Sequence, residues 1–164
     1  MVSFARLLRH LATPGWAVRR AFDAATLQAI EQAIADTERS HGGEIRFAVE
    51  ANVNPLDVMR GITPRHQAVQ AFARLGVWDT DANNGVLIYV SWADRDVEIV
   101  ADRGFNGLVS EQEWAEVCHR MEQSFARGSP RQAIVEGIGA TGALIARHFP
   151  TADRDELPNR PVLL

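Results

Sequence analysis

The chain has 164 residues, of which 46% are hydrophobic and 23% are charged, enough for a single domain that folds without a disulfide or a structural metal. The net charge of −4 disfavours a nucleic-acid binder, and the lone Cys118 excludes an intramolecular disulfide and a multi-cysteine zinc site. No apolar run reaches the roughly 18 residues of a membrane span. All 17 basic residues are arginine, so no lysine nucleophile is available.

The first 22 residues form a basic segment with four arginines and no acidic side chain. Phe4, Leu7 and Leu11 recur at helical spacing, which predicts a short amphipathic helix over 4–11, followed by a linker to residue 22. We expect this helix to pack on its own domain through these three side chains. A partner protein or peripheral contact with a membrane surface through residues 1–20 is the alternative. Because a continuous apolar signal stretch is lacking, we expect a cytoplasmic protein.

Helices and strands alternate along the rest of the chain. Capping residues mark the helix starts: Asp23, Thr63 before Pro64, Ser110 with Glu113, and Ser129 before Pro130. Periodicity predicts, in chain order, a helix over 24–41, a strand over 44–50 with one wetter face, a helical turn over 55–60, a helix over 64–75, strands over 86–91 and 96–101, and helices over 111–127 and 130–149.

The apolar run Val86–Val90 predicts a central strand that is buried on both faces. The helix between strands 44–50 and 86–91 makes them parallel, whereas 86–91 and 96–101 form an antiparallel hairpin. The expected fold class is therefore α/β, a small mixed β-sheet sandwiched between helices (α/β/α) in a single domain. Its parts are the basic helix and linker (1–22), the α/β/α domain (23–150) and a C-terminal tail (151–164).

This topology brings polar residues from separate segments to one rim of the sheet. Carboxylate and amide oxygens are the ligands that Ca²⁺ and Mg²⁺ prefer, so we predict a divalent-cation site there. The alternatives are ordinary polar loops and an ion pair between Asp102 and Arg103. The predicted metal ligands are Asp79, Asp81, Asn83 and Asp102, and the residues lining the rim beside them are Glu44, Asn84 and Arg103.

Two familiar motifs are only partly matched. Asp79, Asp81 and Asn83 begin like a calcium-binding EF-hand loop, but the glycine comes one residue late and Val90 stands where a glutamate is needed. The glycines of Gly137–Gly142 match a dinucleotide-binding fingerprint, which requires a strand before them. The cap at Ser129 starts a helix instead, so we expect these glycines to lie inside a helix.

Several segments resemble the TPM domain family. Gly43–Glu50 is similar to the first strand of that family, while Asn84–Val90 and Val97–Gly104 are similar to its core hairpin. The resemblance covers about residues 24–149, and the closing Glu156–Leu164 looks like the tail of a soluble bacterial subgroup. It implies an α/β/α sandwich, a divalent-cation site in some members and a proposed phosphatase activity. Other members resemble non-enzymatic modulators of membrane complexes.

Two functions are consistent with these observations. The first is a non-catalytic binding module, in which a cation orders the rim and an unidentified protein partner docks beside it. The alternative is a metal-dependent phosphatase-like hydrolase, in which a cation at Asp79, Asp81 and Asp102 polarises a phosphoryl oxygen and Arg103 clamps another. The sequence identifies no nucleophile or general base, so the binding module is the preferred hypothesis.

Overall fold

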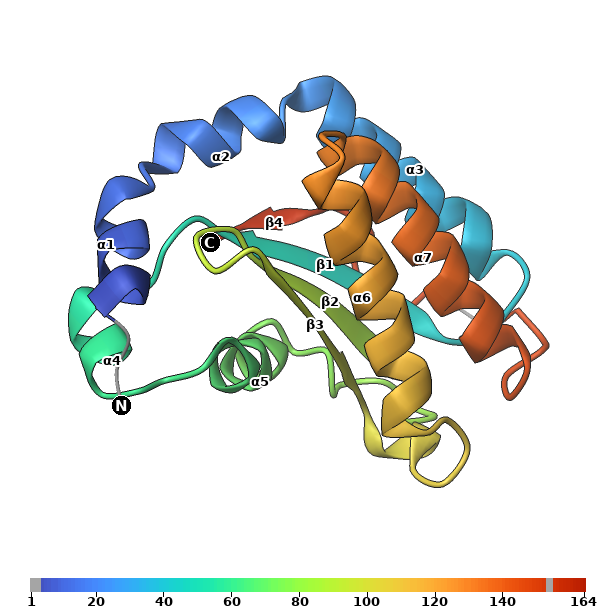
Figure 1. Ribbon diagram of the computed structural model, residues 1–164. Coiled ribbons are helices and arrows are strands. Elements are labelled where there is room, and N and C mark those ends of the chain that lie inside the picture. The colour runs from blue at the N-terminus through green and yellow to red at the C-terminus, as the bar shows by residue number, and fades with distance from the viewer. Residues whose placement is uncertain (1–3, 153–154) are drawn as a thin grey trace.

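A four-stranded sheet lies at the centre of the protein, with helices on both faces (Figure 1). The computed structural model describes residues 4–152 and 155–164. Its elements, in chain order, are α1 (Phe4–Ala12), α2 (Gly15–Ala21), α3 (Ala24–Glu38), β1 (Glu44–Glu50), α4 (Pro55–Met59), α5 (Pro64–Arg74), β2 (Gly85–Ser91), β3 (Asp96–Ala101), a 3-10 turn (Arg103–Phe105), α6 (Glu111–Ala126), α7 (Pro130–Ala146) and β4 (Val162–Leu163).

The strand order is β3-β2-β1-β4, and it confirms the predicted position of the central strand. β2 is parallel to β1, with Val86 opposite Ile45, and antiparallel to β3, with Ile88 opposite Ile99. The short strand β4 was not predicted, because two residues in a polar segment carry no strand periodicity. It pairs in parallel with β1 and covers the outer edge of that strand.

Alternate side chains of β2 enter two hydrophobic cores. Ile88 lies in the larger core, together with side chains of α3, α6 and α7, whereas Leu87 and Tyr89 lie in a smaller core with Ala68 and Ala71 of α5. Figure 1 shows α5 on one side of the sheet and α3, α6 and α7 on the other. The predicted α/β/α architecture is therefore confirmed.

The helix starts and the glycine-containing last helix also match the prediction. Ser110 and Glu113 form a reciprocal capping box at α6, and the side chains of Asp23, Thr63 and Ser129 cap α3, α5 and α7. The glycines of the dinucleotide-like run lie within α7. A Cβ atom on Gly137 would lie 2.2 Å from the sulfur of Met121, so a larger residue there would displace the Met121 side chain between α7 and α6.

The predicted wetter face of β1 is wrong, because both Glu44 and Arg46 are buried. The C-terminal segment covers them. The Arg46 guanidinium donates to the backbone carbonyls of Pro158 and Arg160, and the Leu157 N–H donates to Glu44 Oε2 at 3.0 Å. Both side chains are thus buried with hydrogen-bond partners from the C-terminal segment, while Arg46 Nε has no partner among the described residues.

The expected packing of the N-terminal helix through Phe4 and Leu11 is also wrong, since these side chains are 72% and 61% exposed. α1 is held by its polar face. Arg6 makes two hydrogen bonds to Asp94, Nε to Oδ1 at 2.9 Å and Nη2 to Oδ2 at 3.0 Å, and His10 Nε2 lies 3.1 Å from Oδ1. The nearly buried carboxylate of Asp94, in the turn between β2 and β3, needs these partners, so it sets which face of α1 points inward.

None of the helices within residues 4–152 and 155–164 has the length and apolarity needed to cross a bilayer.

Replacing Asp94 with Asn should loosen α1. Burial opposes the charge of Asp94, but hydrogen bonds from Arg6 and His10 outweigh burial and lower its pKa, so the stabilisation is present at neutral pH and is lost in acid. We expect Asp94→Asn to lower the free energy of unfolding by about 2 kcal/mol at pH 7 and to speed amide exchange in α1. Urea denaturation and hydrogen exchange measure these changes. The control is Asp57→Asn, which removes an ion pair to Arg60 on the surface and should change stability little; equal effects would contradict the assigned role of Asp94.

Candidate functional site

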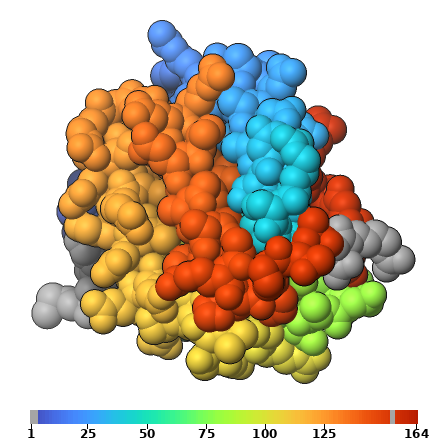
Figure 2. Space-filling model, turned by 90° about the vertical axis from the view of Figure 1, so that its right-hand side faces the viewer, coloured from blue at the N-terminus to red at the C-terminus, as the bar shows by residue number. Residues whose placement is uncertain are grey.

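Two loops cross at the rim of the sheet, where β2 begins and β3 ends. The Gly104 N–H donates to the Asn83 carbonyl at 2.8 Å, and a Cβ atom on Gly104 would lie 2.4 Å from that oxygen. Asn83 has a φ of 52°, a left-handed conformation that asparagine adopts more readily than most residues. Figure 2 shows the loop before β2, in green, against the segment after β3, in yellow. The contact therefore depends on glycine at position 104, which has no Cβ atom, and on asparagine at position 83, which adopts the left-handed conformation.

Two of the predicted rim residues carry buried oxygens that accept no hydrogen bond from the described part of the chain. The Asn84 side chain is 1% exposed; its Nδ2 donates to the Gly42 carbonyl at 2.5 Å, and its Oδ1 is without a partner. Asp102 accepts from the Arg103 backbone N–H through Oδ1 at 2.7 Å, and its Oδ2 is without a partner. A buried acceptor without a donor costs about 1–3 kcal/mol, so both oxygens suit a cation or an ordered water.

The other predicted residues lie around this crossing with different contacts. The guanidinium of Arg103 donates through Nε to Asn83 Oδ1 at 2.8 Å. Asp79 and Asp81 are exposed, and the Asp81 N–H donates to Glu156 Oε2 at 3.1 Å. The structure thus joins Asn83 to Arg103 directly, whereas the carboxylates of Asp79 and Asp81 lie on the surface of the same loop.

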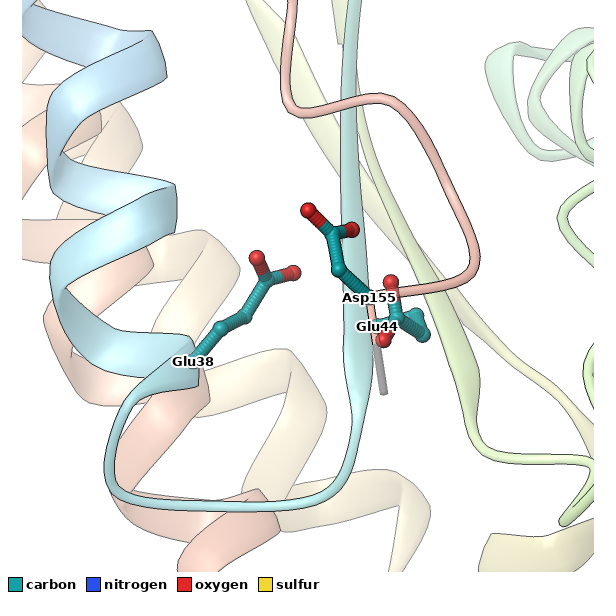
Figure 3. Close-up of side chains that lie close together, drawn as sticks. All are labelled: Glu38, Glu44 and Asp155. Atoms are coloured by element: carbon teal, nitrogen blue, oxygen red, sulfur yellow. The ribbon is translucent and has the colours of Figure 1, made fainter. Parts of the chain in front are cut away.

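Glu44 contributes to a different group, on the side of the rim that faces the C-terminal segment. Among the described residues, Glu38, Glu44 and Asp155 are the only three acidic, histidine or cysteine side chains whose ligand atoms all lie within 4.8 Å of one another. Figure 3 shows the three carboxylates, from the end of α3, the start of β1 and the C-terminal segment. They line a cavity of about 440 Å³ together with Asn159.

The sequence did not reveal this carboxylate cluster, because Asp155 lies far along the chain from Glu38 and Glu44. One signal was present: Glu38 ends α3, where the negative end of the helix dipole disfavours an acidic side chain. Such a residue needs compensation from its surroundings, and here the Ile45 N–H donates to Glu38 Oε1 at 2.9 Å.

Burial makes the carboxylate cluster retain a proton. Burial raises the pKa of Glu38 to about 8, opposed by the Ile45 N–H and reinforced by the negative charges of Glu44 and Asp155. The pKa of Glu44 is also raised by burial, although the Leu157 N–H opposes the shift. At neutral pH the Glu38 carboxyl therefore keeps its proton, which reduces repulsion among the three side chains.

The protonated Glu38 predicts a pH dependence of stability. A folded-state pKa near 8, above the ordinary 4.5, means that the folded protein binds this proton more tightly than the unfolded chain. The free energy of unfolding should therefore fall as the pH rises from about 4.5 to 8, and Glu38→Gln should flatten this fall. Urea denaturation at several pH values measures it. Glu31→Gln, an exposed position on the same helix, is the control, and a wild-type slope in Glu38→Gln would contradict the assignment.

Comparison with known proteins identifies the family. The TPM domain matches residues 19–144. The BA42 protein of the psychrophilic bacterium Bizionia argentinensis, solved by NMR, is 33% identical, with a TM-score of 0.75 over 87% of this chain and 94% of that one. The N-terminal domain of a P. gingivalis protein is 18% identical and shares the fold, with a TM-score of 0.62 over 82% of each chain. No curated protein matches. On the strength of the match over residues 19–144, the chain belongs to the TPM domain family.

Proposed function

We propose that this TPM domain is a non-catalytic binding module whose crossing loops are ordered by a divalent cation, Ca²⁺ or Mg²⁺. The supporting observation is the pair of buried oxygens without hydrogen-bond donors, Asn84 Oδ1 and Asp102 Oδ2. They belong to the two segments that cross, and hard cations prefer such amide and carboxylate oxygens. A cation shared between them would join the start of β2 to the end of β3.

The exposed carboxylates of Asp79 and Asp81 give the cation a second role. They belong to a loop whose backbone contacts include Glu156 of the C-terminal segment. A cation bound at Asp102 attracts these negative charges, so it would draw the loop over residues 79–84 toward the crossing. A protein partner that docks beside this loop would then bind the cation-loaded form more tightly, because loading removes the cost of ordering the loop.

The chemistry around the rim gives less support to the alternative, a metal-dependent phosphatase-like hydrolase. Arg103, the candidate phosphate clamp, uses its Nε to hold Asn83. The hydroxyl of Thr80 accepts from the Asn84 N–H and is nearly buried. Cys118 lies on α6, where burial raises the pKa of its thiol to about 12, so it is not an activated nucleophile.

The proposal predicts a specific loss of cation binding. We expect Asp102→Asn to weaken calcium binding about tenfold or more, and Asp81→Asn to weaken it less, because Asp102 holds a buried oxygen and Asp81 adds exposed charge. Isothermal titration gives the affinities, and NMR reports the ordering of residues 79–84. Asp36→Asn on α3, which removes an exposed carboxylate that contacts Arg39, is the matched control.

Three results would contradict this proposal. In the first, millimolar calcium and magnesium produce neither heat nor a shift in residues 79–84. In the second, calcium binding is lost in Glu44→Gln and kept in Asp102→Asn, which assigns the cation to the carboxylate cluster. In the third, the protein hydrolyses p-nitrophenyl phosphate with a divalent cation, and Arg103→Gln abolishes that activity; the hydrolase alternative would then replace the binding module.

A further inference from the structure

The end of the sheet opposite the rim carries a group of exposed apolar side chains. α1 and α4 lie side by side there, at the left of Figure 1. Phe4, Leu8 and Leu11 of α1 are exposed, and so are Leu56 and Met59 of α4. Positions 4, 8 and 11 fall on one stripe of a helix, so α1 presents an apolar stripe to solvent. Contiguous exposed apolar surface on a folded protein typically marks an interaction site.

The outward direction of this stripe is enforced by the opposite face of α1. Arg6 and His10 point to the nearly buried carboxylate of Asp94, and the Val53 N–H donates to His10 Nδ1 at 3.1 Å. Arg6 also donates to the Ile62 carbonyl at 2.6 Å. Turning the apolar stripe inward would break all these contacts and leave Asp94 buried without partners, which is strongly unfavourable.

The N-terminal helices α1 and α2 concentrate positive charge. Residues 1–22 hold four arginines and no acidic side chain, whereas the rest of the chain has 13 arginines against 21 acidic side chains. Arg9 is half-exposed, with its guanidinium 3.9 Å from Asp94 Oδ1, and Arg19 and Arg20 of α2 are exposed. Asp57, on the neighbouring α4, is paired with Arg60 at 3.3 Å. We call these arginines of α1 and α2, together with the apolar side chains of α1 and α4, the basic apolar face.

We propose that the basic apolar face docks on the surface of an anionic lipid bilayer, with α1 lying in the interface. Exposed leucine and phenylalanine next to arginine is the composition that interfacial helices use, since the apolar side chains enter the acyl boundary and the cations bind headgroups. Trp16, exposed in the first turn of α2, is of the residue type enriched at that depth. In a symmetric dimer through this face, the arginines of the two copies would lie against one another and repel, which favours the bilayer over a second copy.

Vesicle flotation with the full chain tests the proposal. We expect binding to vesicles of phosphatidylcholine with phosphatidylglycerol, no binding to phosphatidylcholine alone, and release by high salt. Leu8→Ser should reduce the partition coefficient about tenfold, because a leucine side chain leaves water on binding. Leu108→Ser is the matched control, since Leu108 is 47% exposed and Leu8 49%. Arg19→Gln with Arg20→Gln should weaken binding, and Arg127→Gln, at an exposed arginine after α6, should not.

Three outcomes would overturn the proposal. One is the absence of binding to phosphatidylglycerol vesicles at low salt. Another is an equal loss of binding in Leu8→Ser and Leu108→Ser. The third is a dimer in sedimentation velocity that Leu8→Ser dissociates, which would show that a second copy of the chain covers this face. Since the substituted leucines and arginines are exposed, each variant is expected to keep the wild-type urea midpoint, which serves as the folding control.

Discussion

The complete burial of β2 is the constraint on which the rest of this structure depends. The strand is covered on both faces and hydrogen-bonded on both edges, so the chain must enter it through a loop that is itself packed. At Gly85 a Cβ atom would lie 1.9 Å from the carbonyl of Val77, so the loop is packed tightly there. The residue before it, Asn84, is buried although it carries a polar amide side chain. Polar side chains gather at the rim because the buried backbone that leads into this apolar central strand needs hydrogen-bond partners.

The two ends of this sheet present different groups to the surface. At the rim, Asp102, Asn84 and the exposed carboxylates of the preceding loop offer oxygens, and the carboxylate cluster lies on the flank that faces the C-terminal segment. At the other end, a single carboxylate, Asp94, gathers the cationic side of α1 and turns its leucines outward. The oxygens of the rim and the exposed leucines of α1 are thus about one strand length apart. In this proposed arrangement one protein has two independent contact regions.

Local signals predicted the parts of the fold that depend on nearby residues. The capping box of Ser110 and Glu113, and the unbroken apolar run of β2, each act within a few positions, and both are confirmed. Topology also placed Asn83 beside Gly104, because a hairpin fixes which loops meet. The predictions that were wrong depend on contacts between residues far apart in the sequence. The Arg46 guanidinium binds the carbonyl of Pro158, 112 positions away, and no residue near Arg46 in the sequence indicates that the C-terminal segment buries it. The direction of α1 was misjudged because amphipathicity identifies two faces, but only Asp94 decides which one points inward.

The backfolding of the C-terminal segment has a consequence for the order in which the protein is made. β1 is translated before the C-terminal segment, yet residues 162–163 pair with its outer edge, and backbone groups of residues 157–160 bind its Glu44 and Arg46. During synthesis the nascent domain therefore holds a glutamate and an arginine whose final partners do not yet exist. The pairing of β4 with β1 therefore follows translation of residues 162–163, and until then this edge of β1 is open to pairing with other strands.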